Sequence, residues 1–510
     1  MSYSTSFAAL LATLVLGTPA EAAEPAERMP ELDDALQPIL QRLEELVERF
    51  RGGPVSPSRS QAFERELQQT TRDLARVATQ WTYNHLEAAQ ASALPPEVQY
   101  EGSRYRRLTK KTPQAVSTLF GDIRVWRLGY RGARDVGEPV LFPLCRVLGL
   151  VQGATPALVE RVAHYQAEGG ATQQRTLTRL RQEHGVHWGV KRLRQVVTCV
   201  AAAMEEQRAA AQVEQVLHWL AAAQASRGRH KPVLCIGRDG ITLGVRLKQG
   251  WLYEVASTGT LTIYDRRGRR LGTVYVAVTP EPGQATLTGQ LTHVLQEVLR
   301  RWQGPLPRLS YVTDAGDNET AYYQKVLRRL RHPRSGERLL WCWVVDYYHA
   351  SERLWTMAEA LFGKGPRSWT WVRKLQKLLL KPGGVGRVLH SAGALRSRLQ
   401  PKGARRANFQ KAYRYLQKRR QHMRYADCRR LGIPIGSGVT EAACKTVYTQ
   451  RLKLSGMRWR KAGAQTILTL RVILLSGVWQ QVYERTLETY SEVQVPTPNA
   501  SGRAAGTKAA

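Results

Sequence analysis

Two aspartates stand where the fold can bring their carboxylates together. Asp239 ends the apolar run VLCIGRD and Asp314 ends LSYVTD, so the sequence places each at the edge of a buried strand. If the two strands are neighbours, the carboxylates converge at one end of a sheet, where a cation must offset their repulsion. Alone, either aspartate could simply be a turn residue that closes a strand.

Glu441 is a third acid, at the head of a predicted helix with basic surroundings. Residues 434–440 have the composition of a loop entering a helix, and the helix dipole favours an acid in the first turn. An ordinary helix-start residue would satisfy that pattern. The same helix continues through Lys445, Arg451 and Lys453, however, so the sequence also suits an acid that completes a metal cluster beside phosphate-binding residues.

The charge balance predicts a polyanionic partner. The 510 residues include 76 Lys and Arg against 41 Asp and Glu, a net charge of +35. Residues 1–100 are acidic, with 8 basic and 14 acidic side chains, so the rest carries the whole surplus. Such a surplus is self-repulsive unless nucleic acid neutralises it. A generic basic protein, such as a ribosome-associated factor, is the alternative.

Cysteine usage predicts a cytoplasmic protein, and the expected DNA partner predicts association with the nucleoid. The six cysteines are scattered, with no close pair that would indicate zinc or a disulfide framework. The start, MSYSTSFAALLATLVLGTPAEAAEPAER, imitates a secretory signal, but no Lys or Arg precedes its apolar stretch. We therefore expect a start site placed too early or a frayed apolar helix there. The sequence contains no run of eighteen apolar residues, so it predicts no membrane-spanning helix.

The first 215 residues divide into three predicted modules. Residues 1–95 are an N-terminal helical region, in which an acidic hairpin either pairs subunits or caps the next domain. Residues 96–150 are a small basic β module. Residues 151–215 contain three helical pieces separated by glycine turns, which resemble a DNA-binding helix-turn-helix or are an ordinary helical domain.

Residues 216–350 predict the first part of an α/β core. Six short β-branched or aromatic runs, with a helix between the fourth and fifth, indicate a mixed sheet. Residues 351–424 predict a basic helical insertion, 425–484 the C-terminal helix part of the core, and 485–510 a disordered tail. Eleven Lys or Arg lie between Lys402 and Arg430, among Tyr413, Tyr415 and Tyr425, which either stack on bases or pack internally.

Four segments together carry a family resemblance: IGRDG, YVTDAGDNE, DYYHASERLW and IPIGSGVTEAACKTVYTQRLKLSGMRW. Over roughly residues 100–480 they resemble ISKra-type insertion-sequence transposases, which have an RNase H-like fold and a DDE triad. The resemblance implies an RNase H-like α/β catalytic core with a mixed five-stranded sheet and a helical insertion. It also implies a bacterial transposase that hydrolyses phosphodiesters at transposon ends and joins the 3′ end to target DNA.

The resemblance assigns roles to individual residues. It implies that Asp239, Asp314 and Glu441 form the catalytic triad and hold two Mg²⁺ ions, or Mn²⁺, with the insertion filling the 127-residue gap between the last two acids. Asp346 and His349 in DYYH resemble a pair that supports the site in Mutator-like transposases, with metal ligation as the alternative. Asp317 and Glu319 lie near enough to Asp314 to be alternatives for the second acid. The β module departs from the family, because GARDVGEPVLFPLC replaces its paired cysteines, so no zinc is expected there.

The basic residues near the triad complete the prediction. Those expected to bind DNA are Lys445, Arg451, Lys453, Arg458, Arg460, Arg405, Arg406, Arg419 and Arg420. We expect the protein to form a homo-oligomer on DNA and to bind both the transposon ends and the target DNA. Two other interpretations stay open: a non-catalytic DNA-binding protein derived from a transposase, and a structure-specific nuclease of the same fold.

Overall fold

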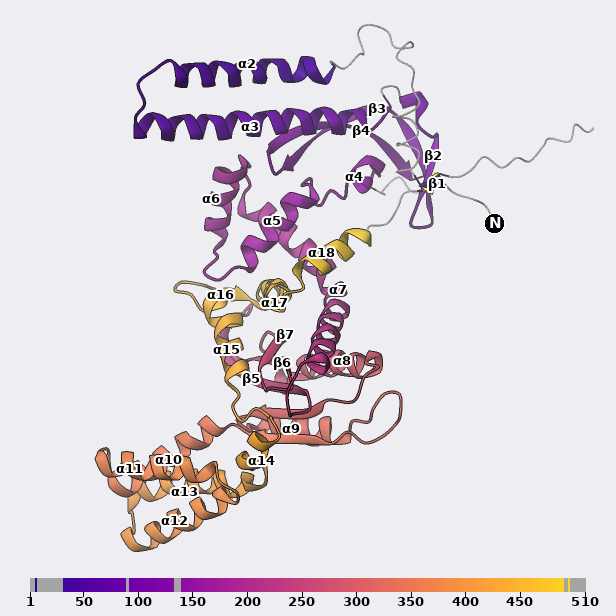
Figure 1. Cartoon of the computed structure of the whole chain (residues 1–510). Coiled ribbons are helices and arrows are strands. Elements are labelled where there is room, and N and C mark those ends of the chain that lie inside the picture. Colours follow the sequence, from indigo (N-terminus) through magenta and orange to yellow (C-terminus); the bar gives the residue numbers. More distant parts are fainter. Residues whose placement is uncertain (1–4, 7–30, 89–90, 133–138, 490–493, 496–510) are drawn as a thin grey trace, which may run out of the picture. The chain divides into compact units, whose positions relative to one another are not determined.

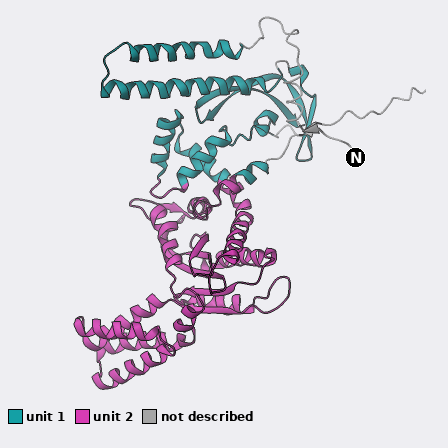
Figure 2. Cartoon of the chain, viewed as in Figure 1, with its two compact units in different colours: residues 1–166, 172–200, 484–510 teal, residues 167–171, 201–483 magenta. Residues whose placement is uncertain are grey.

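The computed structural model describes residues 5–6, 31–88, 91–132, 139–489 and 494–495. The chain forms two compact units (Figure 2): residues 1–166, 172–200 and 484–510, and residues 167–171 and 201–483. Helix α7 (Val190–Ala225) belongs to both, so the predicted boundary at 215/216 falls inside a continuous helix. The signal-like apolar start lies outside the described residues.

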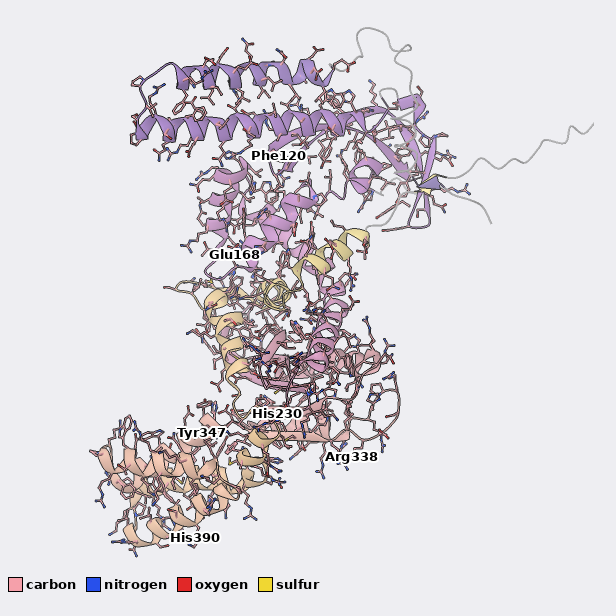
Figure 3. The ribbon with its side chains drawn as sticks, viewed as in Figure 1. Phe120, Glu168, His230, Arg338, Tyr347 and His390 are labelled. Carbon is pink, nitrogen blue, oxygen red and sulfur yellow. The ribbon has the colours of Figure 1, made fainter. Side chains whose placement is uncertain are left out.

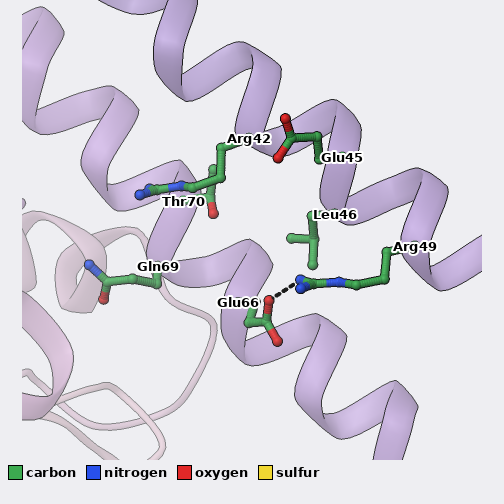
Figure 4. Close-up of a pocket in the computed structure, with 7 residues that line it drawn as sticks. All are labelled: Arg42, Glu45, Leu46, Arg49, Glu66, Gln69 and Thr70. Atoms are coloured by element: carbon green, nitrogen blue, oxygen red, sulfur yellow. Dashed lines mark hydrogen bonds and ion pairs between the residues drawn. The ribbon is translucent and has the colours of Figure 1, made fainter.

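The first unit begins with two helices that run side by side (Figure 1), α2 (Leu32–Arg51) and α3 (Pro57–His85). Ser56 caps α3 by accepting a hydrogen bond from the Arg59 backbone N–H at 3.3 Å, and Pro57 occupies the first turn. A groove of about 400 Å³ lies between the helices. The Arg49–Glu66 ion pair spans it (Figure 4). The two helices also meet at the stacked rings of Phe50 and Phe63, whose centroids are 4.4 Å apart. This apolar contact stabilises the hairpin more than an exposed ion pair does.

A β module follows the hairpin. Its sheet has the order β1-β11-β2-β3-β4. The elements are β1 (Thr5–Ser6), η1 (Ala91–Ala93), β2 (Glu97–Tyr100), β3 (Ser103–Thr118), β4 (Gly121–Gly132), α4 (Pro143–Val147) and β11 (Gln494–Val495). Ile123 and Val125 alternate with exposed Arg124 and Trp126 along β4, which is the pattern of a strand with one buried face.

Three helices complete the first unit: α5 (Pro156–Ala167), α6 (Gln173–His184) and the start of α7. Thr172 accepts a hydrogen bond from the Arg175 backbone N–H at 3.1 Å and so begins α6. Gly185, at φ 65°, ends α6 in the left-handed conformation that glycine adopts most readily. The three helical pieces predicted from the sequence are therefore confirmed as local structure.

The second unit is built on a mixed sheet with the order β7-β6-β5-β8-β9. The strands are β5 (Val233–Arg246), β6 (Trp251–Tyr264), β7 (Arg270–Val278), β8 (Arg308–Thr313) and β9 (Trp341–Val345). The first three pair antiparallel, whereas β8 and β9 join β5 in parallel. The short β10 (Trp459–Arg460) adds a parallel pairing with the end of β5. The prediction of a mixed α/β sheet is confirmed.

Two details of the predicted strands are wrong. Strand β5 continues past Asp239 to Arg246, and the runs 250–259 and 260–265 form the single strand β6. The sequence predicted two strands in place of β6 because Gly259 suggested a turn between them. In the structure a Cβ at Gly259 would lie 3.0 Å from Leu291 Cδ2, so the glycine allows a helix to pack closely on an unbroken strand.

Helices surround the sheet and bury its apolar faces. The connecting elements are η2 (Pro282–Gln284), α8 (Ala285–Arg301), α9 (Asp317–Lys325) and η3 (Leu327–Arg329). The C-terminal elements are α15 (Gly438–Cys444), a π-helical turn (Lys445–Thr449), α16 (Gln450–Leu452), α17 (Lys461–Leu475) and α18 (Trp479–Glu488). Leu287, Leu291, Val294 and Leu295 form the buried stripe of α8, at the spacing of one helix face.

A helical insertion separates β9 from α15 (Figure 1). It contains α10 (Tyr347–Phe362), α11 (Pro366–Leu379), α12 (Gly384–Leu399), α13 (Gly403–Arg419), η4 (Arg420–His422) and α14 (Tyr425–Arg430). Tyr347 opens α10 and His390 lies on α12 (Figure 3). The Tyr347 backbone N–H donates to the Ile435 carbonyl at 2.9 Å, so the chain enters and leaves the insertion at adjacent points.

Among the described helices, none alone is long and apolar enough to cross a membrane, and the one pair that passes together, α17 and α18, is bent by 117°. At the C-terminal end, α18 reaches Glu488 and β11 includes Gln494 and Val495. The predicted disordered tail at 485–510 therefore starts too early. Its residues 490–493 and 496–510 lie outside the described part of the chain.

A candidate active site beside the mixed sheet

Strand register brings Asp239 and Asp314 to equivalent positions. Gly237 on β5 pairs with Val312 on β8, and two residues further along each chain stand Asp239 and Asp314. Asp314 follows the end of its strand, as predicted, whereas Asp239 lies within β5 at the point where pairing with β8 has stopped. Because side chains alternate along a strand and neighbouring strands are about 4.8 Å apart, both carboxylates start from the same side of the sheet.

Helix α15 brings Glu441 to that same side. Thr440 Oγ1 lies 2.8 Å from Thr260 Oγ1 on β6, which fixes the helix against the sheet. A Cβ at Gly237 would lie only 1.9 Å from Thr440 Oγ1 and 3.1 Å from Thr440 Cβ. Gly237 and Asp239 share one face of β5, so the missing side chain at Gly237 is what lets the helix carrying Glu441 approach the strand carrying Asp239.

The three acids interact electrostatically. Burial raises the pKa of Asp239, and the charges of Asp314 and Glu441 raise it further. Hydrogen bonds from the Gly240 backbone N–H, at 2.7 Å, and from the Cys444 thiol act in the opposite direction. A partly buried carboxylate among other carboxylates is unfavourable without a cation, so the donor set fits a hard metal ion.

Glu441 is held by two groups outside the predicted triad. Ser437 Oγ donates to Glu441 Oε1 at 2.6 Å, and His349 Nδ1 lies 3.5 Å from the same oxygen. The Glu441 side chain is 43% exposed, so one edge remains open to solvent. The position of this carboxylate therefore depends on the loop before α15 and on helix α10.

Asp346 is the buried anchor of this part of the site. It caps α10 by accepting a hydrogen bond from the His349 backbone N–H at 2.7 Å, and its other oxygen accepts from the Ser437 backbone N–H. That oxygen also lies 2.8 Å from Ser437 Oγ, whose single hydroxyl proton it shares with Glu441. Burial acts to raise the pKa of Asp346, but the hydrogen bonds from His349 and Ser437 outweigh it and leave the pKa lowered. The Asp346 carboxylate, 3.4 Å from His349 Nδ1, raises the pKa of His349 to about 9, so the imidazole is charged at neutral pH.

The described residues contain one group of Asp, Glu, His or Cys whose ligand atoms all lie within 4.8 Å of one another: Asp346, His349 and Glu441. The predicted triad of Asp239, Asp314 and Glu441 is not packed that tightly. Glu441 belongs to both sets, since its charge acts on Asp239 while its carboxylate contacts Ser437 and His349. The structure thus places all five predicted site residues in one region, with Glu441 as the link.

The inserted helices fix the loop that bears Asp314. The Tyr415 hydroxyl donates to the Asp314 carbonyl at 2.6 Å, and the Arg419 guanidinium donates to the Ala315 carbonyl at 2.6 Å. Ala315 has φ 58°, an uncommon conformation for alanine. Asp314 Oδ1 accepts from the Gly316 backbone N–H at 3.0 Å, which closes a tight turn. These bonds leave the Asp314 carboxylate oriented by backbone rather than by other side chains.

Glu319 is a fourth acid beside the site. It is 9% exposed on α9, and burial raises its pKa to about 7, with the charges of Asp314 and Asp239 acting in the same direction. A Cβ at Gly316 would lie 2.5 Å from Glu319 Oε2 and 3.5 Å from Asp314 Oδ1, so both carboxyl groups flank this glycine. Asp317, the other alternative for the second acid, is exposed in the first turn of α9.

Sequence reasoning missed Ser437 and Cys444. They stand four residues before and three residues after Glu441, spacings that share a helix face, and this was the available signal.

The predicted DNA-binding residues fall into two groups. Those exposed are Lys445, Lys453, Arg458, Arg460, Arg405, Arg406 and Arg420. The prediction for Arg451 is wrong: its side chain is buried at 1% exposure, with the guanidinium 5.2 Å from the Trp459 ring centroid. Arg419 is occupied by the Ala315 carbonyl. Tyr415 and Tyr425 also pack internally, since the hydroxyl of each donates to a backbone carbonyl.

No protein-family model matches the chain, and no curated protein matches it at a significant level.

Proposed function

We propose that the protein is a DDE-type DNA transposase of the RNase H-like superfamily. It acts on DNA in the cytoplasm, cuts the ends of a bacterial insertion sequence and joins the 3′ ends to target DNA. The observation that carries the proposal is the convergence of Asp239, Asp314 and Glu441 from β5, the end of β8 and α15, with charges that act on one another. A mixed sheet of six strands, one more than the five expected, supports it, with a helical insertion between β9 and β10.

The carboxylates suit two Mg²⁺ ions, or Mn²⁺, because hard cations prefer oxygen ligands and would relieve the repulsion at Asp239. When bound, the ions would activate water or a 3′-hydroxyl and stabilise the leaving 3′-oxygen. The chain supplies the positions of the ligands. Cys444 and the Gly240 N–H orient Asp239, and Ser437 with His349 orients Glu441.

The insertion supplies charge for DNA. Residues 351–424 contain 19 Lys and Arg against two acids, Glu352 and Glu359. The arginines at 405, 406 and 420 are exposed, as are most other basic side chains of α11–α13. Each phosphate that such residues contact releases counterions and strengthens binding, most strongly at low salt.

The test is metal-dependent strand cleavage. The purified protein is incubated with Mg²⁺ and labelled DNA carrying the ends of its own element, beside Asp239→Asn, Glu441→Gln and the matched control Glu359→Gln, an exposed acid on α10. We expect nicking and joining by the wild type and the control, and neither by the two site variants, while all four bind DNA. DNA binding without cleavage by the wild type would refute catalysis and leave a non-catalytic DNA-binding protein. Cleavage without joining would instead identify a structure-specific nuclease.

A further inference from the structure

Strands β5 and β6 extend beyond the rest of the sheet as a two-stranded arm, residues 241–256. Pairing of β5 with β8 ends at Gly237, and pairing of β6 with β7 ends at Ser257. Beyond those points the two strands pair with each other up to Arg246 and Trp251, and β10 joins β5 at Val245 and Arg246. The arm therefore projects from the sheet, with β7 and β8 no longer paired along its edges.

The two faces of the arm differ. Leu243 and Val245 point to one face and are buried at 2% and 0% exposure. The other face carries Trp251, Tyr253 and Val255, which are 43%, 71% and 39% exposed. The alternation of side chains along a strand produces this division, and it leaves three large apolar side chains in a row in water.

The two aromatic side chains of this face lie next to each other. The rings of Trp251 and Tyr253 have centroids 6.2 Å apart and an interplanar angle of 29°. Tyr253 pairs with Gly244, and a Cβ at Gly244 would lie 2.8 Å from Tyr253 Cε1, so the ring lies against bare backbone. A glycine at that position lets the tyrosine lie flat instead of projecting away.

The surroundings of the aromatic pair are basic. Arg246 pairs with Trp251, Lys248 lies in the connecting turn, and Arg460 pairs with Arg246 through β10; all three basic residues are exposed. The one acid of the arm, Glu254, pairs with Leu243 and so belongs to the opposite face. Aromatic rings beside cations, with no acid on the same face, are complementary to a polyanion that has exposed bases.

We propose that this face of the arm binds unpaired nucleotides of DNA, with bases stacked on Trp251 and Tyr253 and phosphates held by Arg246, Lys248 and Arg460. Unpaired bases are needed because bases within a duplex already stack on each other. The inference rests on the proposed function only in taking DNA as the substrate. Gly244, beneath the tyrosine, is five residues along β5 from Asp239, or about 17 Å. Because this spacing is odd, the aromatic pair lies on the opposite face of β5 from Asp239, so the arm would hold a single-stranded segment apart from the candidate site.

The test measures binding without metal, so it is independent of cleavage. Full-length protein in EDTA is titrated into a labelled single-stranded oligonucleotide and, separately, into a duplex of the same sequence, with fluorescence anisotropy as the readout. Trp251→Leu and Tyr253→Leu remove a π face but keep apolar bulk, and Tyr253→Phe keeps the face. Trp126→Leu is the matched control, because Trp126 is also 43% exposed but lies on β4.

We expect each leucine variant on the arm to weaken single-strand binding about tenfold and duplex binding less than twofold, since stacking contributes about 1–3 kcal/mol per base. Tyr253→Phe and Trp126→Leu should bind like the wild type. Equal losses for both DNAs, or no loss for either, would overturn the proposal. A change in oligomeric state of the leucine variants on size-exclusion chromatography, without loss of single-strand binding, would overturn it in favour of a second copy covering the arm. Loss of Mg²⁺-dependent cleavage in a separate assay would bear on the proposed function alone.

Discussion

Replacing Gly237 with alanine tests whether close packing of α15 assembles the site. The new Cβ would lie 1.9 Å from Thr440 Oγ1 and 2.8 Å from Thr260 Oγ1, whereas ordinary contacts begin near 3.4 Å. The hydroxyl cannot simply move away, because Thr440 is 2% exposed and its own Cβ would lie 3.1 Å from the new atom. Helix α15 must therefore shift by roughly 1 Å or more, and Glu441 shifts with it.

The magnitude follows from that displacement. Inserting a methyl group into a packed core costs about 1–3 kcal/mol, so the free energy of unfolding should fall by that amount. A misplacement of about 1 Å in a catalytic group costs on the order of 100-fold in rate, so cleavage should fall by about that factor while DNA binding stays unchanged. Thermal unfolding and Mg²⁺-dependent nicking measure the two effects separately.

Two further variants make the experiment decisive. Gly289→Ala is the control, because Gly289 lies in α8 with nothing within 4 Å of an added Cβ. The double variant Gly237→Ala/Thr440→Ala removes the clashing hydroxyl, and we expect it to recover part of the lost stability and activity. If Gly237→Ala alone has wild-type stability and wild-type cleavage, the argument that this glycine sets the approach of α15 is refuted.

Three other substitutions have defined outcomes. Asp239→Asn should raise the melting temperature by a few degrees in EDTA at pH 8, because a carboxyl whose pKa is raised loses its stabilising contribution as pH rises, and the ionised form is then unfavourable. His349→Gln should remove a stabilisation that is fully present below about pH 6.5 and is lost as pH rises through about 9, measured as the free energy of unfolding against pH. Burial raises the pKa of Glu87 to about 7, so the wild-type first unit should lose at most about 3 kcal/mol of stability as pH rises from about 4.5 to 7. Glu87→Gln should not show this loss.

Each of these has an outcome that contradicts it. A lower melting temperature for Asp239→Asn in EDTA would mean that the acids do not repel one another in the folded protein. Parallel pH profiles for wild type and His349→Gln would mean that the imidazole is not ion-paired with Asp346. For Glu87, whose Oε2 accepts from the Leu128 N–H at 2.9 Å, hydrogen exchange of the β module measures the first unit directly, and an unchanged pH dependence would contradict the raised pKa.

Local signals were sufficient to select the three acids as candidates. Asp239 and Asp314 follow β-branched runs, and Glu441 follows a loop rich in glycine, so each was recognisable from its immediate neighbours. The sequence did not predict that Asp239 lies within a longer strand, because Gly240 also suits a turn. Only the pairing with β6 shows that the strand continues. The mixed sheet was predictable from the order of strands and helices, whereas the arm depends on this extension.

Contacts between distant residues account for what the sequence did not predict. Ser437 contacts Asp346, 91 residues earlier, and Tyr415 contacts Asp314, 101 residues earlier. Arg451 is a residue type that binds phosphate, but its side chain on α16 is buried. Burial lowers the pKa of its guanidinium to about 10. No local pattern distinguishes an arginine that faces solvent from one that packs under a tryptophan.

The bonds from α13 to the Asp314 loop determine when the candidate site can form during synthesis of the chain. A nascent chain that has emerged as far as Val345 has every strand of the sheet except β10, but the carbonyls of Asp314 and Ala315 still lack the donors that Tyr415 and Arg419 provide. Glu441 emerges later again. A prematurely terminated polypeptide that ends before residue 415 therefore has two of the three acids on an unsupported loop and strand. Because these residues are spread along the sequence, the candidate site can assemble only after almost the whole chain has been translated.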